Sequence, residues 1–122
     1  MNKLLITLLL ISPFSFAEWG DVYYCQMTSF VGTDADGKVE QYKLEKFQFK
    51  LDKSKQAAVF GDRGYFAGST TRLADWTKHR TEETWRGENT YDSITMFDRG
   101  TFFMVDVNYG SIDSVSADCD KF

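Results

Sequence analysis

The sequence predicts an all-β fold: a small antiparallel meander of about seven or eight short strands that forms a closed or nearly closed barrel, or a sandwich. Three observations predict it. Apolar and polar residues alternate at period two along most of the chain. Gly, Asp and Asn interrupt the alternation at short intervals, as turns do. Two cysteines, Cys25 and Cys119, lie near the two ends of the chain.

Residues 1–17 have the pattern of an export signal. A lysine precedes an apolar run over residues 4–11, a proline then breaks the helix, and Ser15 and Ala17 are the small residues expected before a signal-peptidase cut. The apolar stretch is shorter than the roughly 20 residues that cross a bilayer, so we expect cleavage, with no membrane span afterwards. The sequence therefore predicts one barrel-like domain over residues 18–122, exported to the periplasm or the cell exterior.

In an oxidising compartment the two cysteines have only each other as partners, so we expect a disulfide between Cys25 and Cys119. The bridge would place the first and last strands side by side. On the chain-entropy model, closing so long a loop stabilises the domain by about 4–5 kcal/mol. The alternatives are two free thiols or a shared metal site, although two cysteines without a nearby histidine supply too few ligands for zinc.

The first strand is expected at residues 22–30, where Tyr23, Cys25 and Met27 share one face. That face points inward, because a disulfide at Cys25 would be buried with it. The next segment, residues 33–38, carries an Asp-Gly pair, which is favoured where a hairpin needs a positive φ. It is expected to be a turn.

Residues 45–52 form the clearest strand, because Phe47 and every second residue after it are apolar while lysine and glutamine alternate with them. One face is therefore core and the other faces water. Beyond it we expect a short strand at 57–60, a tight turn at 61–64 and a partner strand at 64–67.

Strands at 93–97 and 101–109 flank an Asp-Arg-Gly turn at 98–100. The second strand is apolar on both faces, which is typical of a strand covered on both sides or of one whose outer face is apolar and exposed. The residues sharing one of these faces are Phe103, Val105, Val107 and Tyr109, and those on the other are Phe102 and Met104.

The last strand is expected at 111–120, with every second residue from Val115 to Cys119 pointing inward. Ile112 is out of step with Val115, which predicts a bulge or bend near residues 113–114.

The segment 68–92 departs from the strand pattern. It is polar and charged, and its large apolar residues are Trp76 and Trp85. It fits either one short helix or a long loop, and a long irregular segment in a small domain is often functional.

Aromatic residues make up 16% of the chain, and most should fill the core. Some lie in polar surroundings, where they either cover the open ends of the barrel or meet a ligand or partner. With the single histidine, the candidates for ligand or partner binding are Trp76, His79, Trp85, Tyr91 and Phe102.

A partial calcium-loop pattern surrounds Asp34 and Asp36. Glycine occupies position 32, where a first carboxylate belongs, and Lys43 occupies the place of the final glutamate. An ordinary turn explains the segment better, so we predict no metal and no cofactor.

The formal net charge of −4 and the lack of a basic run argue against nucleic acid as a partner. No nucleophile elbow, phosphate loop or Cys-x-x-Cys motif is present. We therefore expect a monomeric, non-enzymatic binding or interaction module for an unknown small molecule or protein. One alternative is an envelope-associated assembly component that exposes Phe102 and Met104. Another is a hydrolase that uses carboxylates of residues 82–92 with His79 in support.

The two ends of the chain also suggest a more specific form of the binding module. Tyr23-Tyr24-Cys25, paired with Cys119, resembles the N-terminal Tyr-x-Cys and last-strand cysteine of small exported bacterial inhibitors of C-type lysozyme, and residues 76–78 echo their inhibitory loop. The resemblance implies a β-barrel that acts on a basic partner protein. An acidic chain would suit such a partner.

Overall fold

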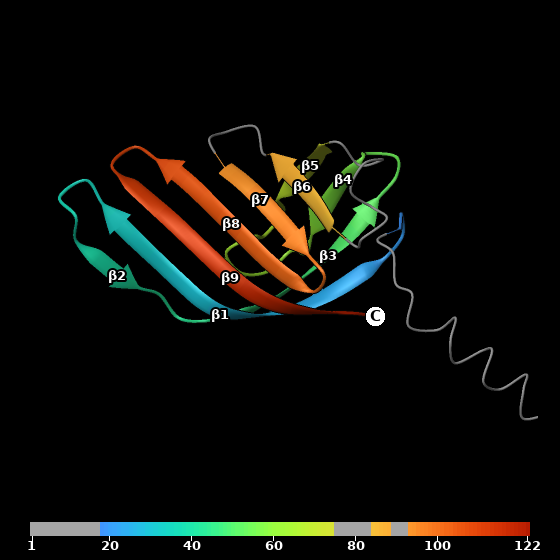
Figure 1. The fold of residues 1–122 in the computed structure, drawn as a ribbon, viewed down its shortest axis with the longest axis horizontal. Coiled ribbons are helices and arrows are strands. Elements are labelled where there is room, and N and C mark those ends of the chain that lie inside the picture. The colour runs from blue at the N-terminus through green and yellow to red at the C-terminus, as the bar shows by residue number, and fades with distance from the viewer. Residues whose placement is uncertain (1–17, 75–83, 89–92) are drawn as a thin grey trace, which may run out of the picture.

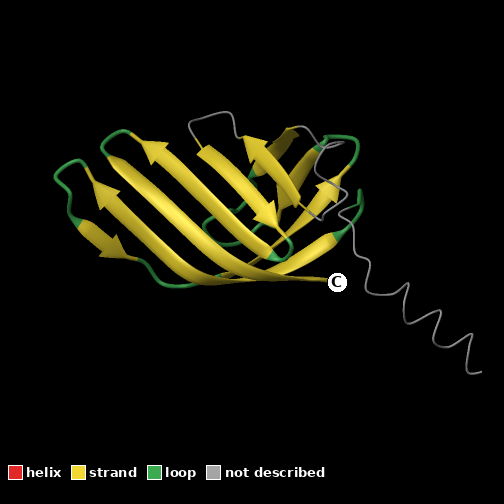
Figure 2. Cartoon of the chain, viewed as in Figure 1, coloured by secondary structure: helices red, strands yellow, loops and turns green. Residues whose placement is uncertain are grey.

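The computed structural model describes residues 18–74, 84–88 and 93–122, so the expected export signal lies outside the described part. Every regular element within those ranges is a strand (Figure 2). No helix there is long and apolar enough to cross a membrane. The strands are β1 (Val22–Asp34), β2 (Val39–Gln41), β3 (Lys46–Asp52), β4 (Ala57–Phe60), β5 (Thr70–Ala74), β6 (Thr84–Glu88), β7 (Ser93–Asp98), β8 (Thr101–Asn108) and β9 (Ser111–Lys121).

The predicted barrel is confirmed. From β3 to β9 each strand pairs antiparallel with the next one along the chain, and β9 returns to pair with β1. β1 also pairs with β3, which closes an eight-stranded antiparallel barrel. The short strand β2 is additional and pairs only with the C-terminal part of β1. Figure 1 shows β1 and β9 lying side by side along their length, with β2 at the outer end of β1.

Turn chemistry accounts for the tight connections. β7 and β8 are joined through Arg99 and Gly100, which both have positive φ, and β8 and β9 through Gly110, whose φ is +84°. The expected turn after β1 is present as well, with Gly37 at a φ of +82°. Glycine adopts this left-handed region without the steric cost that a Cβ brings.

The segment 68–92 needs a correction. Its described residues include strands β5 and β6, so it is not one continuous loop, and the expected short helix could fall only on residues 75–83 or 89–92, which lie outside the described residues. The partner of β4 is β5, not residues 64–67, which form a turn. The sequence does not reveal β5 and β6, because a strand of five residues has only two or three inward side chains, too few to produce a clear apolar alternation in a polar segment.

The bulge also lies elsewhere than predicted. β9 alternates regularly, whereas the register between β1 and β9 shifts between Met27 and Ser29, at Thr28. Before the bulge the odd-numbered residues of β1 face the core, and after it Phe30 and Gly32 do. The bulge thus turns the second half of β1 so that Phe30 points into the barrel.

The core fills the barrel with aromatic rings. Tyr23, Phe49 and Phe102 are all at most 1% exposed, and the Tyr23 and Phe49 rings stack with centroids 5.1 Å apart. Aromatic pairs of this kind add to the free energy of burying their apolar area.

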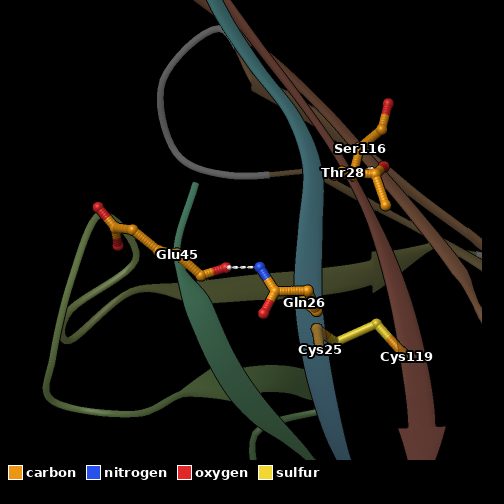
Figure 3. Close-up of a disulfide and its surroundings, with 6 residues drawn as sticks. All are labelled: Cys25, Gln26, Thr28, Glu45, Ser116 and Cys119. Atoms are coloured by element: carbon orange, nitrogen blue, oxygen red, sulfur yellow. Dashed lines mark hydrogen bonds between the residues drawn. A yellow bond between two sulfur atoms is a disulfide. The ribbon is translucent and has the colours of Figure 1, made fainter. Parts of the chain in front are cut away.

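The predicted disulfide between Cys25 and Cys119 is present and closes a loop with a sequence separation of 94. The two residues face each other in the β1–β9 register, with Cα atoms 4.0 Å apart (Figure 3). On the other side of β1, the Gln26 side-chain amide donates to the Glu45 carbonyl at 3.4 Å. The first and last strands are therefore joined both by backbone pairing and by a covalent bond.

Candidate functional site

The strongest candidate site is a polar cavity of about 380 Å³ at one end of the barrel, called here the mouth cavity. Its walls come from the end of β8 and the starts of β5, β7 and β9, which meet at the same end because neighbouring strands are antiparallel. Within the described chain it is lined by Tyr65, Phe66, Ser69, Thr71, Ser93, Thr95, Met104, Asp106, Asn108 and Asp113.

Two carboxylates face each other in this cavity. Asp106 on β8 and Asp113 on β9 are direct partners in the strand register. The Tyr65 hydroxyl lies between them, 3.4 Å from Asp106 Oδ2 and 3.3 Å from Asp113 Oδ2. A phenol has one proton to donate, so it fully satisfies only one of these acceptors at a time. The Asn108 side-chain amide adds a long contact of 3.5 Å to Asp106 Oδ2.

Tyr65 is held in place by the loop between β4 and β5. Its backbone N–H donates to Glu45 Oε1 at 2.9 Å, and its ring packs edge-on against Phe30 with centroids 4.7 Å apart. Phe30 reaches this position only because the bulge at Thr28 turns it inward. The loop thus carries the phenol to the carboxylates from a distant part of the sequence.

The electrostatics of the cavity act on this phenol. Burial, followed by the negative charges of Asp113 and Asp106, raises the pKa of Tyr65 well above its usual value. Both effects disfavour a tyrosinate. Tyr65 therefore remains a hydrogen-bond donor throughout the physiological pH range.

Several polar groups in or beside the mouth cavity have no hydrogen-bond partner among the residues that the structure describes. Thr71 and Thr95 are 4% and 2% exposed, and their hydroxyls make no hydrogen bond within the described part of the chain. Asp113 Oδ1 is buried and also has no hydrogen-bond donor there. Buried polar atoms are nearly always paired, so Asp113 Oδ1 requires an explanation, whereas the two threonine hydroxyls are open to the cavity and available to a ligand.

A larger hollow, of about 660 Å³, lies on the outer surface. It is formed by residues of β1, β3 and β9, most of them outward-facing, and by the loop at 61–63, with lysine, arginine and aspartate side chains in its walls. Its charged groups are mostly exposed, and water satisfies exposed groups without a ligand. The smaller mouth cavity is the better candidate because most of its polar groups are buried or half-buried.

The structure corrects two of the sequence-predicted binding residues. Trp85 is 2% exposed and stacks on Phe97 with ring centroids 5.5 Å apart, and Phe102 is 0% exposed. Both belong to the core and offer no surface to a partner. The remaining candidates, Trp76, His79 and Tyr91, lie outside the described residues.

Phe102 and Met104 do not form the exposed assembly surface that the sequence suggested for β8. Phe102 and Met104 point inward, while the alternate residues Phe103, Val105 and Val107 are 44–46% exposed. They adjoin exposed apolar residues of the neighbouring strands, in the register pairs Met96 with Phe103, Ile94 with Val105 and Val107 with Ile112. These six residues are called here the outer apolar patch.

The segment that contains the weak calcium candidates Asp34 and Asp36 forms a turn. Asp34 Oδ1 accepts hydrogen bonds from the backbone N–H groups of Asp36 at 3.0 Å and Lys38 at 2.9 Å. A carboxylate that caps the following backbone in this way stabilises a turn. The geometry of Asp34 is thus that of a turn residue.

Sequence reasoning missed the mouth cavity. Asp106 and Asp113 carried a usable signal, because each breaks an apolar alternation close to the turn that joins β8 and β9. Tyr65 carried none, because its position depends on how the loop folds over the barrel.

Comparisons with models of protein families, with curated proteins and with solved structures find no match for the chain.

Proposed function

We propose that this chain is a small non-enzymatic binding module, active after export, that holds a small polar molecule in the mouth cavity. The observation that carries the proposal is Thr95, a side chain 2% exposed whose hydroxyl lines the cavity without a hydrogen-bond partner in the described chain. The Thr95 hydroxyl oxygen is not among the buried unpaired atoms of the described residues, so it is open to the cavity, where a ligand can take the place of water as its partner.

The size of the cavity supports the same proposal. A volume of about 380 Å³ falls within the range of small-molecule sites, roughly 300–1,000 Å³. Phe66 and Met104 give it an apolar part, and hydroxyl, amide and carboxylate groups form most of the rest of its lining. Such a lining suits a small polar molecule that also carries an apolar part.

The experiment is a thermal-shift and calorimetric screen of the purified protein against small sugars, carboxylates, amines and alcohols. Binding in the cavity is identified by its loss in Thr95→Val, which keeps the side-chain shape and removes the hydroxyl. Thr101→Val is the matched control, because Thr101 lies outside the cavity at the start of β8. If no compound binds in a manner sensitive to Thr95→Val, the proposal is wrong.

A second candidate function is self-association through the outer apolar patch. Its six side chains are 44–52% exposed and form one contiguous area across β7, β8 and β9. Side chains of these sizes offer on the order of 500 Å² per copy, so two copies facing each other would bury roughly 1,000 Å², the lower limit for a specific interface. The partner that this area fits is a second copy of the chain.

Analytical ultracentrifugation over a wide concentration range tests the second candidate. A dimer that dissociates in Phe103→Ser, but not in Lys50→Ser on the outer face of β3, would support it. A strict monomer at all concentrations would exclude it.

A further inference from the structure

The described lining of the mouth cavity is acidic. Asp106 and Asp113 contribute two carboxylates, and no lysine, arginine or histidine is present among the described residues that line the cavity. The ion pairs of the described chain are Arg99 with Asp98 and Lys121 with Asp21, so neither cavity carboxylate has a cationic partner there. Two like charges in a partly buried site repel each other unless a positive charge lies between them.

The protein supplies few donors to these acceptors. An ionised carboxylate accepts hydrogen bonds at two oxygens and donates none. The Tyr65 hydroxyl contacts one oxygen of each carboxylate at 3.3–3.4 Å, which is long for an O–H···O bond. The two carboxylates are therefore short of donors, and a ligand rich in N–H donors complements them.

From this geometry, and resting on the proposed function, we infer that the mouth cavity binds a small organic cation, a primary ammonium, whose N–H groups donate to Asp106 and Asp113. An ammonium carries three donors and one positive charge, which matches two carboxylates and the nearby hydroxyls. Charge-assisted hydrogen bonds of this kind are about twice as strong as neutral ones.

An organic cation fits the cavity better than a metal ion does. No group of three or more His, Cys, Asp or Glu side chains within the described chain is placed to hold a metal. The cavity is also much larger than an ion, and the Phe66 and Met104 side chains give it an apolar wall. That wall suits the hydrocarbon part of an alkyl or aryl ammonium.

Calorimetric titration of the purified protein with butylammonium and benzylammonium chlorides tests the inference. Butanol and benzyl alcohol are the neutral counterparts, sodium butyrate is the anionic one, and calcium chloride is the metal probe. We expect the ammonium salts to bind, and Asp106→Asn to weaken their binding at least about tenfold, because it removes one partner of a charged hydrogen bond. Asp113→Asn is a second variant with the same expected effect, in case the first does not fold.

Asp118→Asn is the matched control. Asp118 lies on β9 as Asp113 does, but on the exposed outer face, and the substitution changes the net charge equally. It should change ammonium affinity less than about twofold, because solvent screens exposed charges. An equal loss of ammonium affinity in Asp118→Asn and in Asp106→Asn would show a general charge effect and overturn the inference.

The other outcomes separate the inference from the proposed function. If an alcohol or butyrate binds, loses this binding in Thr95→Val, and the ammonium salts do not bind, then the inference of a cationic ligand is wrong but the proposed binding function holds. If calcium chloride alone binds and Asp106→Asn abolishes it, the site is a metal site and the inference is overturned. If no compound in the wider screen binds with sensitivity to Thr95→Val, both are wrong.

Discussion

Gly32 and Asp113 face each other across the β1–β9 pair, and a Cβ added to Gly32 would lie 2.9 Å from Asp113 Oδ1. The same Cβ would lie 2.5 Å from the Tyr42 hydroxyl oxygen. Glycine at this position therefore leaves the space that the Asp113 carboxylate and the Tyr42 ring occupy. The mouth cavity depends on a missing side chain as well as on the side chains that line it.

Gly32→Ala should lower the free energy of unfolding by about 1–3 kcal/mol, because the added methyl group forces the Tyr42 ring and the Asp113 carboxylate to move. Urea denaturation measures the change. Gly61→Ala is the control, since a Cβ there would meet only Gln48, at 3.4 Å or more, and Gly61 does not have a positive φ. Equal effects of the two substitutions would contradict the crowding at Gly32.

Tyr65→Phe should make the stability of the folded protein decline less steeply as the pH rises in the alkaline range. The folded-state pKa of Tyr65 is raised, so above pH about 10, the ordinary pKa of tyrosine, the unfolded chain loses this proton while the folded protein keeps it. The stability that Tyr65 contributes is thus complete below pH 10 and is lost as the pH rises toward the folded-state pKa.

Melting temperatures measured from neutral to strongly alkaline pH test this prediction. The decline above pH about 10 should be shallower in Tyr65→Phe than in the parent chain. Tyr109→Phe removes a fully exposed tyrosine and serves as the control. Parallel curves for Tyr65→Phe and the parent chain would refute the prediction.

Cys25→Ser should lower the melting temperature by at least about 15 °C. The disulfide spans a sequence separation of 94, for which the chain-entropy model gives about 4–5 kcal/mol, and each kcal/mol corresponds to about 4–8 °C in a domain of this size. Calorimetry of the parent chain with and without reductant provides the same comparison without mutation. A fall of only a few degrees in both experiments would show that β1–β9 pairing alone holds the ends together.

Phe102→Ala and Phe103→Ala form a matched pair on β8. Phe102 is 0% exposed, so its truncation leaves a cavity and should cost about 3–5 kcal/mol. Phe103 is 46% exposed, and its truncation should cost less than about 1 kcal/mol. Equal costs in denaturant unfolding would contradict the orientation of β8.

The antiparallel barrel was predictable because consecutive strands of a meander pair with each other and a disulfide brings the first and last strands together. The inward faces of β1, β3 and β9 were predictable too, since each has one clearly apolar face. β8 was ambiguous because both faces are apolar, and alternation separates two faces without saying which one is inside. The bulge lies in β1 and not in β9 because Ile112 faces outward, so the alternation of β9 continues unbroken through residues 113–114.

From the sequence alone follow the fold class, the closing disulfide and most strand boundaries, because these depend on local alternation, turn residues and the location of two cysteines. The tertiary structure alone decided the inner face of β8, the bulge at Thr28 and the meeting of Tyr65 with Asp106 and Asp113. The physical reason is that a cavity is formed by side chains from distant segments. Their separation in space depends on strand register and loop path, which local sequence does not determine.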